Sequence, residues 1–489
     1  MTGGKLEEFD ASPSAASLIE GLRDFGYSFN TAIADIIDNS IAAGATSIDI
    51  SASFFLGNPR IAFIDNGKGM TSEDLRIAMR PGSQSPKDLR AKFDLGRFGL
   101  GLKTASFSQC RKLTVVTRYN GVTNSAQWDL DFVAASNKWS VLIPPIKDVF
   151  GIQNLSAEVG TLVLWEEIDR IGVDGNNIES ENHFNELLSV LADHLGLVFH
   201  RFLDGEAKRH KKLTISINGR PIDSINPFNP SNQRTNRKPE ERLSNGAIVT
   251  PYVLPHPKTV SPTEFIAFEG VSGYVNSQGF YLYRVDRLIV WATWFGVARK
   301  SPSTKLLRIA IDIDNDSDDK WQINVLKASA NLPRDTKREL RRLIDSWRGA
   351  ARSTFTRRET VKNLDSKFRT WTRVETDDSI RYQIDITAPI IKHMLEGLTD
   401  DARTKVSHLL QVVASDLPVE SMFVDLSDHQ ERVNTDVLTS DAAADLASGL
   451  VQILRLDGHT NDDIKKVLDD LDLLQNHSEL VRNVLKELK

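Results

Sequence analysis

Apolar and polar residues follow both helical and strand periods in the first third of the chain. From Ala15 to Ala43 the apolar residues recur at helical spacing, which predicts helices with one buried face. Shorter segments that alternate or are continuously apolar predict strands. These segments are Ser47–Ser51, Arg60–Ile64, Leu113–Arg118, Ala126–Phe132 and Thr161–Trp165. We therefore expect an α+β domain in which helices pack on a mixed sheet.

The rest of the chain predicts two further domains. A polar connector at Asp174–Glu181 leads into a helical segment at Asn182–Phe202, and helix-like patterns dominate from Arg334 onward, with a boundary near Thr370. Between them, strands are predicted at Lys212–Gly219, Ile248–Val253, Glu264–Tyr274 and Gly279–Tyr283. We divide the chain into residues 1–175, an α/β unit at 176–345, and a mainly helical, acidic region at 346–489 that begins with a basic helix.

Composition excludes several classes of protein. The 489 residues include a single cysteine, Cys110, which rules out an internal disulfide or a cysteine-based metal cluster and favours a reducing compartment. The N-terminal residues lack the pattern of an export signal, and the most apolar segment, Leu288–Val297, is about half the length of a membrane helix. We expect a cytoplasmic protein that does not insert into membranes.

The net charge of −6 hides an uneven distribution. Between Arg334 and Arg373 there are 13 Lys and Arg against 5 Asp and Glu, interleaved with aromatic residues, whereas Val374–Lys489 has 11 against 23. The basic segment suits contact with nucleic-acid phosphate, and it equally suits a solvated helix beside an acidic domain. DNA binding is one of two hypotheses for this segment.

Two acids and an amide share one face of the predicted helix before the first strand. Asp35, Asp38 and Asn39 have the spacing i, i+3, i+4, which aligns their side chains. An asparagine oxygen is a hard ligand suited to Mg²⁺, and a neighbouring carboxylate can orient an attacking water. Taken alone, the pattern also fits an ordinary polar helix face.

An acid followed by two glycines ends the strand at Arg60–Ile64. In the segment Asp65-Asn66-Gly67-Lys68-Gly69-Met70, the carboxylate can accept a hydrogen bond from an exocyclic amine such as that of adenine. Gly67 and Gly69 leave room for a flat ring. In isolation this segment is also typical of a tight turn.

A third glycine-rich segment runs from Gly96 to Ser106 into a predicted helix start. Such a segment presents backbone N–H groups to phosphate. It is not a P-loop, because Leu102 separates Gly101 from Lys103 and no strand leads directly into it.

In this order, the three segments resemble the motifs of the GHKL ATPase superfamily (gyrase, the ninety-kilodalton heat-shock chaperone, histidine kinase and MutL), whose ATP-binding unit is the Bergerat fold. Gly160-Thr161 matches the fourth motif of that family. The resemblance is greatest to the MutL and MORC branch and its bacterial stand-alone members, and it covers residues 15–345, more weakly in the second domain, which resembles a transducer.

The resemblance implies roles for individual residues. Asn39 would bind magnesium, Asp65 would recognise adenine, and Thr161 would support Asp65 and the adenine through a water. Asp35 stands where ATP-hydrolysing members have a glutamate base, and Lys327 would be the second-domain lysine that reaches the γ-phosphate. The remaining nucleotide contacts would come from Gly67, Gly69, Met70, Gly99, Leu100, Gly101, Lys103 and Thr104, with residues 79–96 as the ATP lid.

The resemblance further implies ATP and Mg²⁺ as ligands, dimerisation on ATP binding, and a setting in DNA transactions or phage defence with an effector protein as partner. Because aspartate is one methylene shorter than glutamate, a nucleotide-binding scaffold with little hydrolysis is the main alternative. A chaperone-like ATPase acting on proteins is another. A histidine kinase is disfavoured, because the short stretch before Asp35 leaves no room for a phosphoacceptor helix pair.

Overall fold

The computed structural model describes residues 13–55, 57–82, 101–172, 178–255, most of 273–317 and 332–347, 370–375, 380–419, 438–456 and 458–471, with a few single residues elsewhere. The chain forms two compact units. The first comprises residues 1–300 and 305–347, and the second comprises residues 301–304 and 348–489.

The first unit begins with two helices where one amphipathic stretch was expected. They are α1 (Ala15–Arg23) and α2 (Phe29–Ala42), separated by a turn in which Gly26 has a φ of 79°. The Ser28 hydroxyl caps α2 by accepting a hydrogen bond from the Thr31 N–H at 3.3 Å. Four isoleucines bury α2 against the sheet, namely Ile33, Ile36, Ile37 and Ile41. This packing fixes which face of α2 carries its polar residues.

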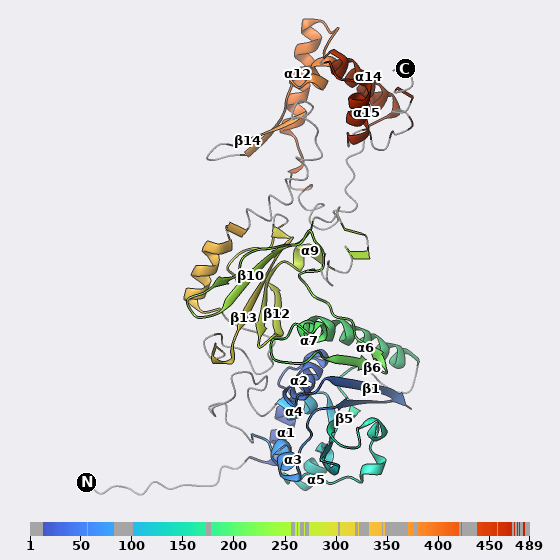
Figure 1. Ribbon diagram of the computed structural model, residues 1–489, viewed down its shortest axis with the longest axis vertical. Coiled ribbons are helices and arrows are strands. Elements are labelled where there is room, and N and C mark those ends of the chain that lie inside the picture. Colours follow the sequence, from blue (N-terminus) through green and yellow to red (C-terminus); the bar gives the residue numbers. More distant parts are fainter. Residues whose placement is uncertain are drawn as a thin grey trace, which may run out of the picture. The chain divides into compact units, whose positions relative to one another are not determined.

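A seven-stranded sheet of order β4-β3-β5-β2-β1-β6-β7 forms the centre of this part of the unit (Figure 1). Its neighbours are antiparallel except β1 and β6, which are parallel, so the sheet is mixed. The strands are β1 (Ser47–Phe55), β2 (Asn58–Asp65), β3 (Cys110–Tyr119), β4 (Val122–Asp129), β5 (Gly160–Ile168), β6 (Thr214–Ile217) and β7 (Arg220–Pro221).

The helices that pack on this sheet share one large apolar core with it. Besides α1 and α2 they are α3 (Ser72–Met79), α4 (Gly101–Phe107), α5 (Leu130–Ser136), α6 (Ile178–Val198) and α7 (His200–Asp204). A smaller cluster around Ala62, Ile64 and Leu162 is covered by the short turns η1 (Ile146–Asp148) and η2 (Ile152–Asn154). Both sides of the central strands are therefore buried.

Three assignments around the first sheet differ from the sequence prediction. Strand β4 ends at Asp129, whose carboxylate caps α5 by accepting the Phe132 N–H at 3.0 Å, so the predicted strand to Phe132 is too long. Helix α6 already begins at Ile178, within the expected connector. Strand β6 pairs in parallel with β1, so it lies in the first sheet, although the sequence assigned it to the second domain. The division at residue 175 stays a prediction.

A second sheet completes the first unit, with strand order β12-β11-β13-β10-β8 and β9 paired to β10. Its strands are β8 (Asn236–Arg237), β9 (Glu241–Arg242), β10 (Ile248–Val253), β11 (Gly279–Arg284), β12 (Arg287–Thr293) and β13 (Leu307–Ile313). The predicted strand at Glu264–Tyr274 is wrong, because the described residues there that have regular structure are helical, including the start of α9 (Gly273–Asn276).

The second unit is mainly helical, as expected. It contains the hairpin β14 (Trp371–Glu375) and β15 (Ile380–Ile384), then α11 (Pro389–Met394), α12 (Asp400–Ser415), α14 (Ser440–Leu456) and α15 (Asn461–Asp470). Trp371, which the sequence placed in a basic helical stretch, lies in a strand, and residues 348–369 of that stretch are outside the described residues. The α+β fold class is confirmed.

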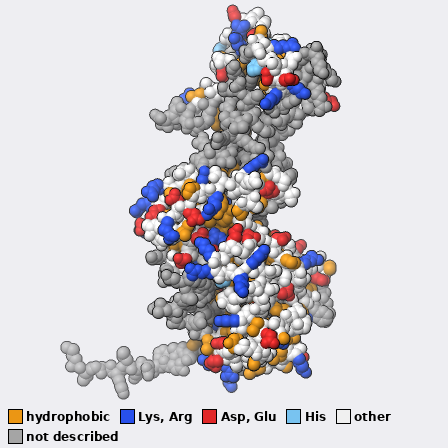
Figure 2. Space-filling view, in the orientation of Figure 1, with side chains coloured by type: hydrophobic (Ala, Val, Ile, Leu, Met, Phe, Trp, Pro, Cys, Tyr) orange, Lys and Arg blue, Asp and Glu red, His pale blue; other side chains and the backbone are white. Residues whose placement is uncertain are grey.

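None of the helices in the described part of the chain is long and apolar enough to span a bilayer. On the face of the first unit in Figure 2, basic and acidic side chains are interspersed.

Candidate functional site

Helix α2 presents two buried acids and one exposed amide. The side chains of Asp35 and Asp38 are only 3% and 1% exposed, whereas Asn39, on the same face, is open to solvent. The isoleucines that bury the other side of α2 hold this polar face in place. A ligand would therefore meet Asn39 first.

Asp35 is connected to the start of helix α4 through Tyr27. The Tyr27 hydroxyl donates a hydrogen bond to Asp35 Oδ2 at 2.8 Å and also hydrogen-bonds the Thr104 side chain. Burial, followed by the charge of Asp35, raises the pKa of the Tyr27 phenol far above its usual value, so it stays a donor. A Cβ placed on Gly101 would lie 3.7 Å from Asp35 Oδ2. The carboxylate thus lies beside the first residue of α4.

Arg287 of strand β12 forms ion pairs with both acids of α2. Its Nε lies 2.8 Å from Asp38 Oδ1, and one of its terminal nitrogens lies 3.7 Å from Asp35 Oδ1. The short Nε contact is electrostatic, because its N–H is not aligned for a hydrogen bond. Its guanidinium carbon lies 5.7 Å from the centre of the Phe199 ring. The second sheet therefore contributes a buried cation to the polar face of α2.

Asp65 is the last residue of β2 and is 7% exposed. Its Oδ2 accepts a hydrogen bond from the Ser40 hydroxyl at 2.8 Å, and its Oδ1 accepts the Gly67 N–H at 2.9 Å. Burial raises the pKa of this carboxyl above its usual value, and these hydrogen bonds partly oppose the shift. Through Ser40, helix α2 is joined directly to the end of β2.

The two glycines after Asp65 are required by close packing. Gly67 has no room for a Cβ, which would lie 2.9 Å from Asp65 Oδ1, and at Gly69, whose φ is 69°, a Cβ would lie 1.8 Å from the Arg118 carbonyl oxygen. The Met70 N–H donates to the Thr117 hydroxyl at 2.9 Å. The loop after β2 is thereby held against β3.

Thr161 lies opposite Asp65 in the pairing of β2 with β5. Its hydroxyl is 3.3 Å from that of Thr117, which also donates to the Gly160 carbonyl at 3.2 Å. Thr117 thus contacts both the Met70 backbone and Thr161, and Thr161 pairs with Asp65 in the sheet.

Lys103 does not extend into solvent. It is 2% exposed, and its Nζ donates to the Ala78 carbonyl at 2.8 Å, in the last turn of α3. Burial lowers the pKa of its ammonium to about 8. Of the remaining sequence candidates, Gly99, Leu100, Lys327 and lid residues 83–96 lie outside the described residues.

Four residues of this site were missed by sequence reasoning. Ser40, which adjoins Asn39, and Tyr27, which stands eight residues before Asp35, belong to the same local segment and carried a weak signal. No local sequence pattern indicated Thr117 or Arg287, because pairing between distant strands brings them to the site.

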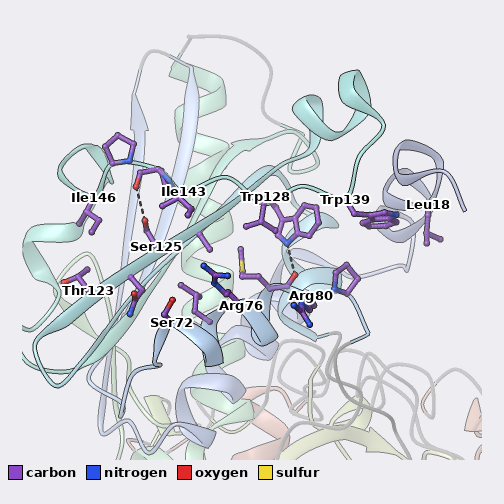
Figure 3. Close-up of a pocket in the computed structure, with 18 of the residues that line it drawn as sticks. Leu18, Ser72, Arg76, Arg80, Thr123, Ser125, Trp128, Trp139, Ile143 and Ile146 are labelled. Atoms are coloured by element: carbon purple, nitrogen blue, oxygen red, sulfur yellow. Dashed lines mark hydrogen bonds between the residues drawn. The ribbon is translucent and has the colours of Figure 1, made fainter. Parts of the chain in front are cut away.

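A separate hollow of about 1020 Å³ lies between α3 and the edge strand β4 (Figure 3). Trp128 and Trp139 form an edge-to-face pair in its wall, with ring centres 6.2 Å apart. The Trp128 indole N–H donates to the Met79 carbonyl at 3.0 Å, next to the carbonyl that binds Lys103. The end of α3 thus contacts both the wall of the hollow and Lys103 of α4.

A group of possible metal ligands, which the sequence did not indicate, lies at α7. Atoms of His200, Asp204 and Glu206 that can bind metal lie within 4.8 Å of one another. Burial lowers the pKa of His200 to about 3, and its Nε2 is hydrogen-bonded to the Tyr283 hydroxyl at 2.8 Å. We assign this group no function.

Comparisons with known proteins point to the same part of the chain. Residues 27–161 match the family described as histidine kinase-, DNA gyrase B-, and HSP90-like ATPase. The chain is 36% identical over 88 residues to the DNA mismatch repair protein MutL of Halobacterium salinarum, and 35% identical over 94 residues to that of Borreliella afzelii. Each match covers 18% of this chain and only 13% and 14%, respectively, of the relative.

Proposed function

Because residues 27–161 form an ATPase domain of the GHKL superfamily, in its MutL-like branch, we propose that this protein binds ATP with Mg²⁺ and hydrolyses it as a nucleotide-gated, dimerising clamp. The family supports ATP binding, and the residues described above supply the specific roles. The observation that carries the proposal is the hydrogen bond between Ser40 and Asp65, which fixes the acidic face of α2 beside the carboxylate at the end of β2.

Asp65 has the chemistry needed to recognise adenine. A buried carboxylate accepts hydrogen bonds strongly, and the Ser40 hydroxyl and the Gly67 and Thr161 N–H groups use three of its roughly four lone pairs, which leaves acceptor capacity for one further donor. An exocyclic amine fits this requirement, whereas the carbonyl at the same position of guanine would face a carboxylate. Selection of ATP over GTP is the expected consequence.

The donor set on α2 fits a magnesium ion that accompanies the phosphates. Asn39 offers an exposed amide oxygen, and the neighbouring acids make the local field negative. When bound, the ion would neutralise charge on the phosphates. Gly101 and Thr104, at the start of α4, would contact the phosphates together with Gly99 and Leu100.

Asp35 is the proposed general base. Tyr27 fixes one of its oxygens and Arg287 lies near the other, so the carboxylate is held in one orientation beside Gly101. A fixed carboxylate can accept the proton of the attacking water. Lys327 would stabilise the charge of phosphoryl transfer.

The cellular role is a finer proposal. The curated relatives are named as DNA mismatch repair proteins, and the basic segment at 334–373 supports a DNA partner for this chain. We propose that ATP binding joins two chains, that the clamp acts on DNA in repair or phage defence, and that an effector protein binds the acidic region. The substitution of aspartate for glutamate at position 35 instead favours a scaffold with little turnover.

The test is ATP hydrolysis with Mg²⁺ by wild type and by Asp35→Asn, with and without double-stranded DNA, while dimer formation is followed with a non-hydrolysable analogue. The clamp predicts turnover that DNA raises and that the substitution reduces by at least about 100-fold. Binding without turnover in the wild type would support the scaffold. Stimulation by unfolded protein, with no effect of DNA, would support a chaperone.

A further inference from the structure

The turn between β11 and β12 has an unfavourable backbone. Arg284 pairs with Arg287, so Val285 and Asp286 are its two central residues, with φ of 49° and 65°. Turns of this kind normally use asparagine and glycine, because a β-branched residue such as valine is strained at positive φ. Such strain persists where surrounding contacts determine the conformation.

Those contacts are made with the first sheet and its helices. Val285 packs against the large apolar core, and Asp286 Oδ1 lies 3.3 Å from an Arg201 guanidinium nitrogen on α7. The other Asp286 oxygen accepts the Lys208 N–H at 3.0 Å. The tip of the hairpin is therefore docked on the first part of the chain, and the residue that follows the tip is Arg287.

Arg287 compensates the negative charge of two buried acids on helix α2. Asp35 and Asp38 lie one helical turn apart and are almost fully buried, so two like charges would repel each other with little water between them. The Arg287 side chain is 5% exposed and forms ion pairs with both. Three further neighbours in the described part of the chain are uncharged in the neutral range: the Tyr27 phenol, the Phe199 ring, and His194, whose pKa is lowered to about 4 by burial and then by Arg287.

We propose that Arg287 is a positioning residue for Asp35, and that the β11–β12 turn thereby makes ATP turnover depend on docking of the second sheet. This inference rests on the proposed ATP hydrolysis. In that reaction the water oxygen bonds to the γ-phosphorus, the bond to the bridging oxygen breaks, ADP leaves with the electron pair, and Asp35 takes the water's proton. When the turn leaves, the guanidinium leaves with it, repulsion from Asp38 displaces Asp35, and turnover stops while nucleotide still binds.

The first experiment compares Arg287→Gln with wild type in the full chain. We expect kcat to fall by about tenfold to 100-fold, less than the roughly 10²–10⁴-fold loss on removal of a general base, with KM for ATP within about threefold. The matched control is Arg237→Gln, the same substitution at an exposed residue of the same sheet, which should leave both constants unchanged. An unchanged or raised kcat in Arg287→Gln would overturn the proposal.

A second variant separates positioning from folding. In Arg287→Gln combined with Asp38→Asn, Asp35 no longer has a charged neighbour to repel it, so kcat should recover at least about fivefold over the single variant. A hairpin that served only to hold the fold together would give no recovery, which would overturn the inference. The double variant also keeps the test valid if the single variant unfolds, because it restores charge balance.

A third variant tests the docking itself. Asp286→Asn removes the ion pair with Arg201 but leaves Arg287 intact, so it should lower kcat less than Arg287→Gln and leave KM unchanged. A greater loss of kcat in Asp286→Asn than in Arg287→Gln would contradict the role of Arg287. Absence of turnover in wild type would instead mean that the proposed function itself fails, which distinguishes the two failures.

Discussion

Asp65→Asn should separate the stability of the protein from its affinity for ATP. The substitution removes the charge and keeps the shape. Asparagine can still accept the Gly67 N–H, and the Ser40 hydroxyl, which now donates at 2.8 Å, can rotate to accept from the new amide. The Thr161 backbone N–H is a third donor to Asp65, and the single oxygen of asparagine has two lone pairs for the Gly67 and Thr161 N–H groups. Because replacing a buried charge while its partners stay paired is often close to neutral, we expect the free energy of unfolding to change by no more than about 1 kcal/mol.

The same substitution should weaken ATP binding strongly. A hydrogen bond between the adenine amine and a carboxylate contributes about 1.5–3 kcal/mol, so its loss predicts roughly 10- to 150-fold weaker binding. An amide can also turn its NH₂ group toward a guanine carbonyl, so the preference for ATP over GTP should fall by a similar factor. Affinity and stability are therefore expected to change in opposite directions or independently.

The assay pairs calorimetric titration of ATP and GTP with thermal unfolding, and Asp148→Asn, an exposed acid of the same domain, is the control. The midpoint should change by no more than about 2–4 °C. Burial raises the pKa of Asp65 in the folded chain above its usual value of 3.8, so binding of a proton stabilises the folded state. This contribution is complete below pH 3.8 and is lost as pH rises through the folded-state pKa. The Asn variant should lack this dependence. Unchanged ATP affinity, or a large fall in the midpoint without loss of affinity, would refute the assignment.

Three further substitutions test separate contacts. Gly69→Ala should destabilise the fold by about 1–3 kcal/mol more than the control Gly121→Ala. Both glycines have positive φ, but only at Gly69 would a Cβ lie 1.8 Å from a carbonyl oxygen. Equal midpoints of chemical unfolding for the two variants would contradict this. The pKa of Lys103 is about 8 in the folded chain against 10.5, so stability should rise with pH across that window and Lys103→Met should abolish the rise in a thermal-unfolding series. Tyr27→Phe removes the 2.8 Å donor to Asp35, the proposed general base, and should lower kcat about tenfold or more with little change in KM. Steady-state kinetics that show only a higher KM would argue against this role.

Local spacing was sufficient to predict the parts of the site that lie within one segment. Asp35, Asp38 and Asn39 share a helix face because helical periodicity is a property of neighbours in sequence, and the structure confirms that helix. Asp65 ends its strand as the pattern indicated, and β5 brings Thr161 opposite to it. The motif order carried this information.

Contacts between distant segments could not be predicted in this way. The parallel pairing of β6 with β1 joins Thr214 to Ser47, and no local pattern encodes it. Arg287 likewise reaches α2 because a strained turn docks on a different part of the chain. The requirement for glycine at position 69 has a long-range cause as well, since the obstructing carbonyl belongs to β3.

The most direct test of the central claim is a crystal structure of the full chain with Mg²⁺ and a non-hydrolysable ATP analogue. We predict that the adenine amine lies within hydrogen-bond distance, about 3 Å, of the Asp65 carboxylate, and that the Asn39 oxygen binds the metal. Nucleotide bound elsewhere, or with its base turned away from Asp65, would contradict it.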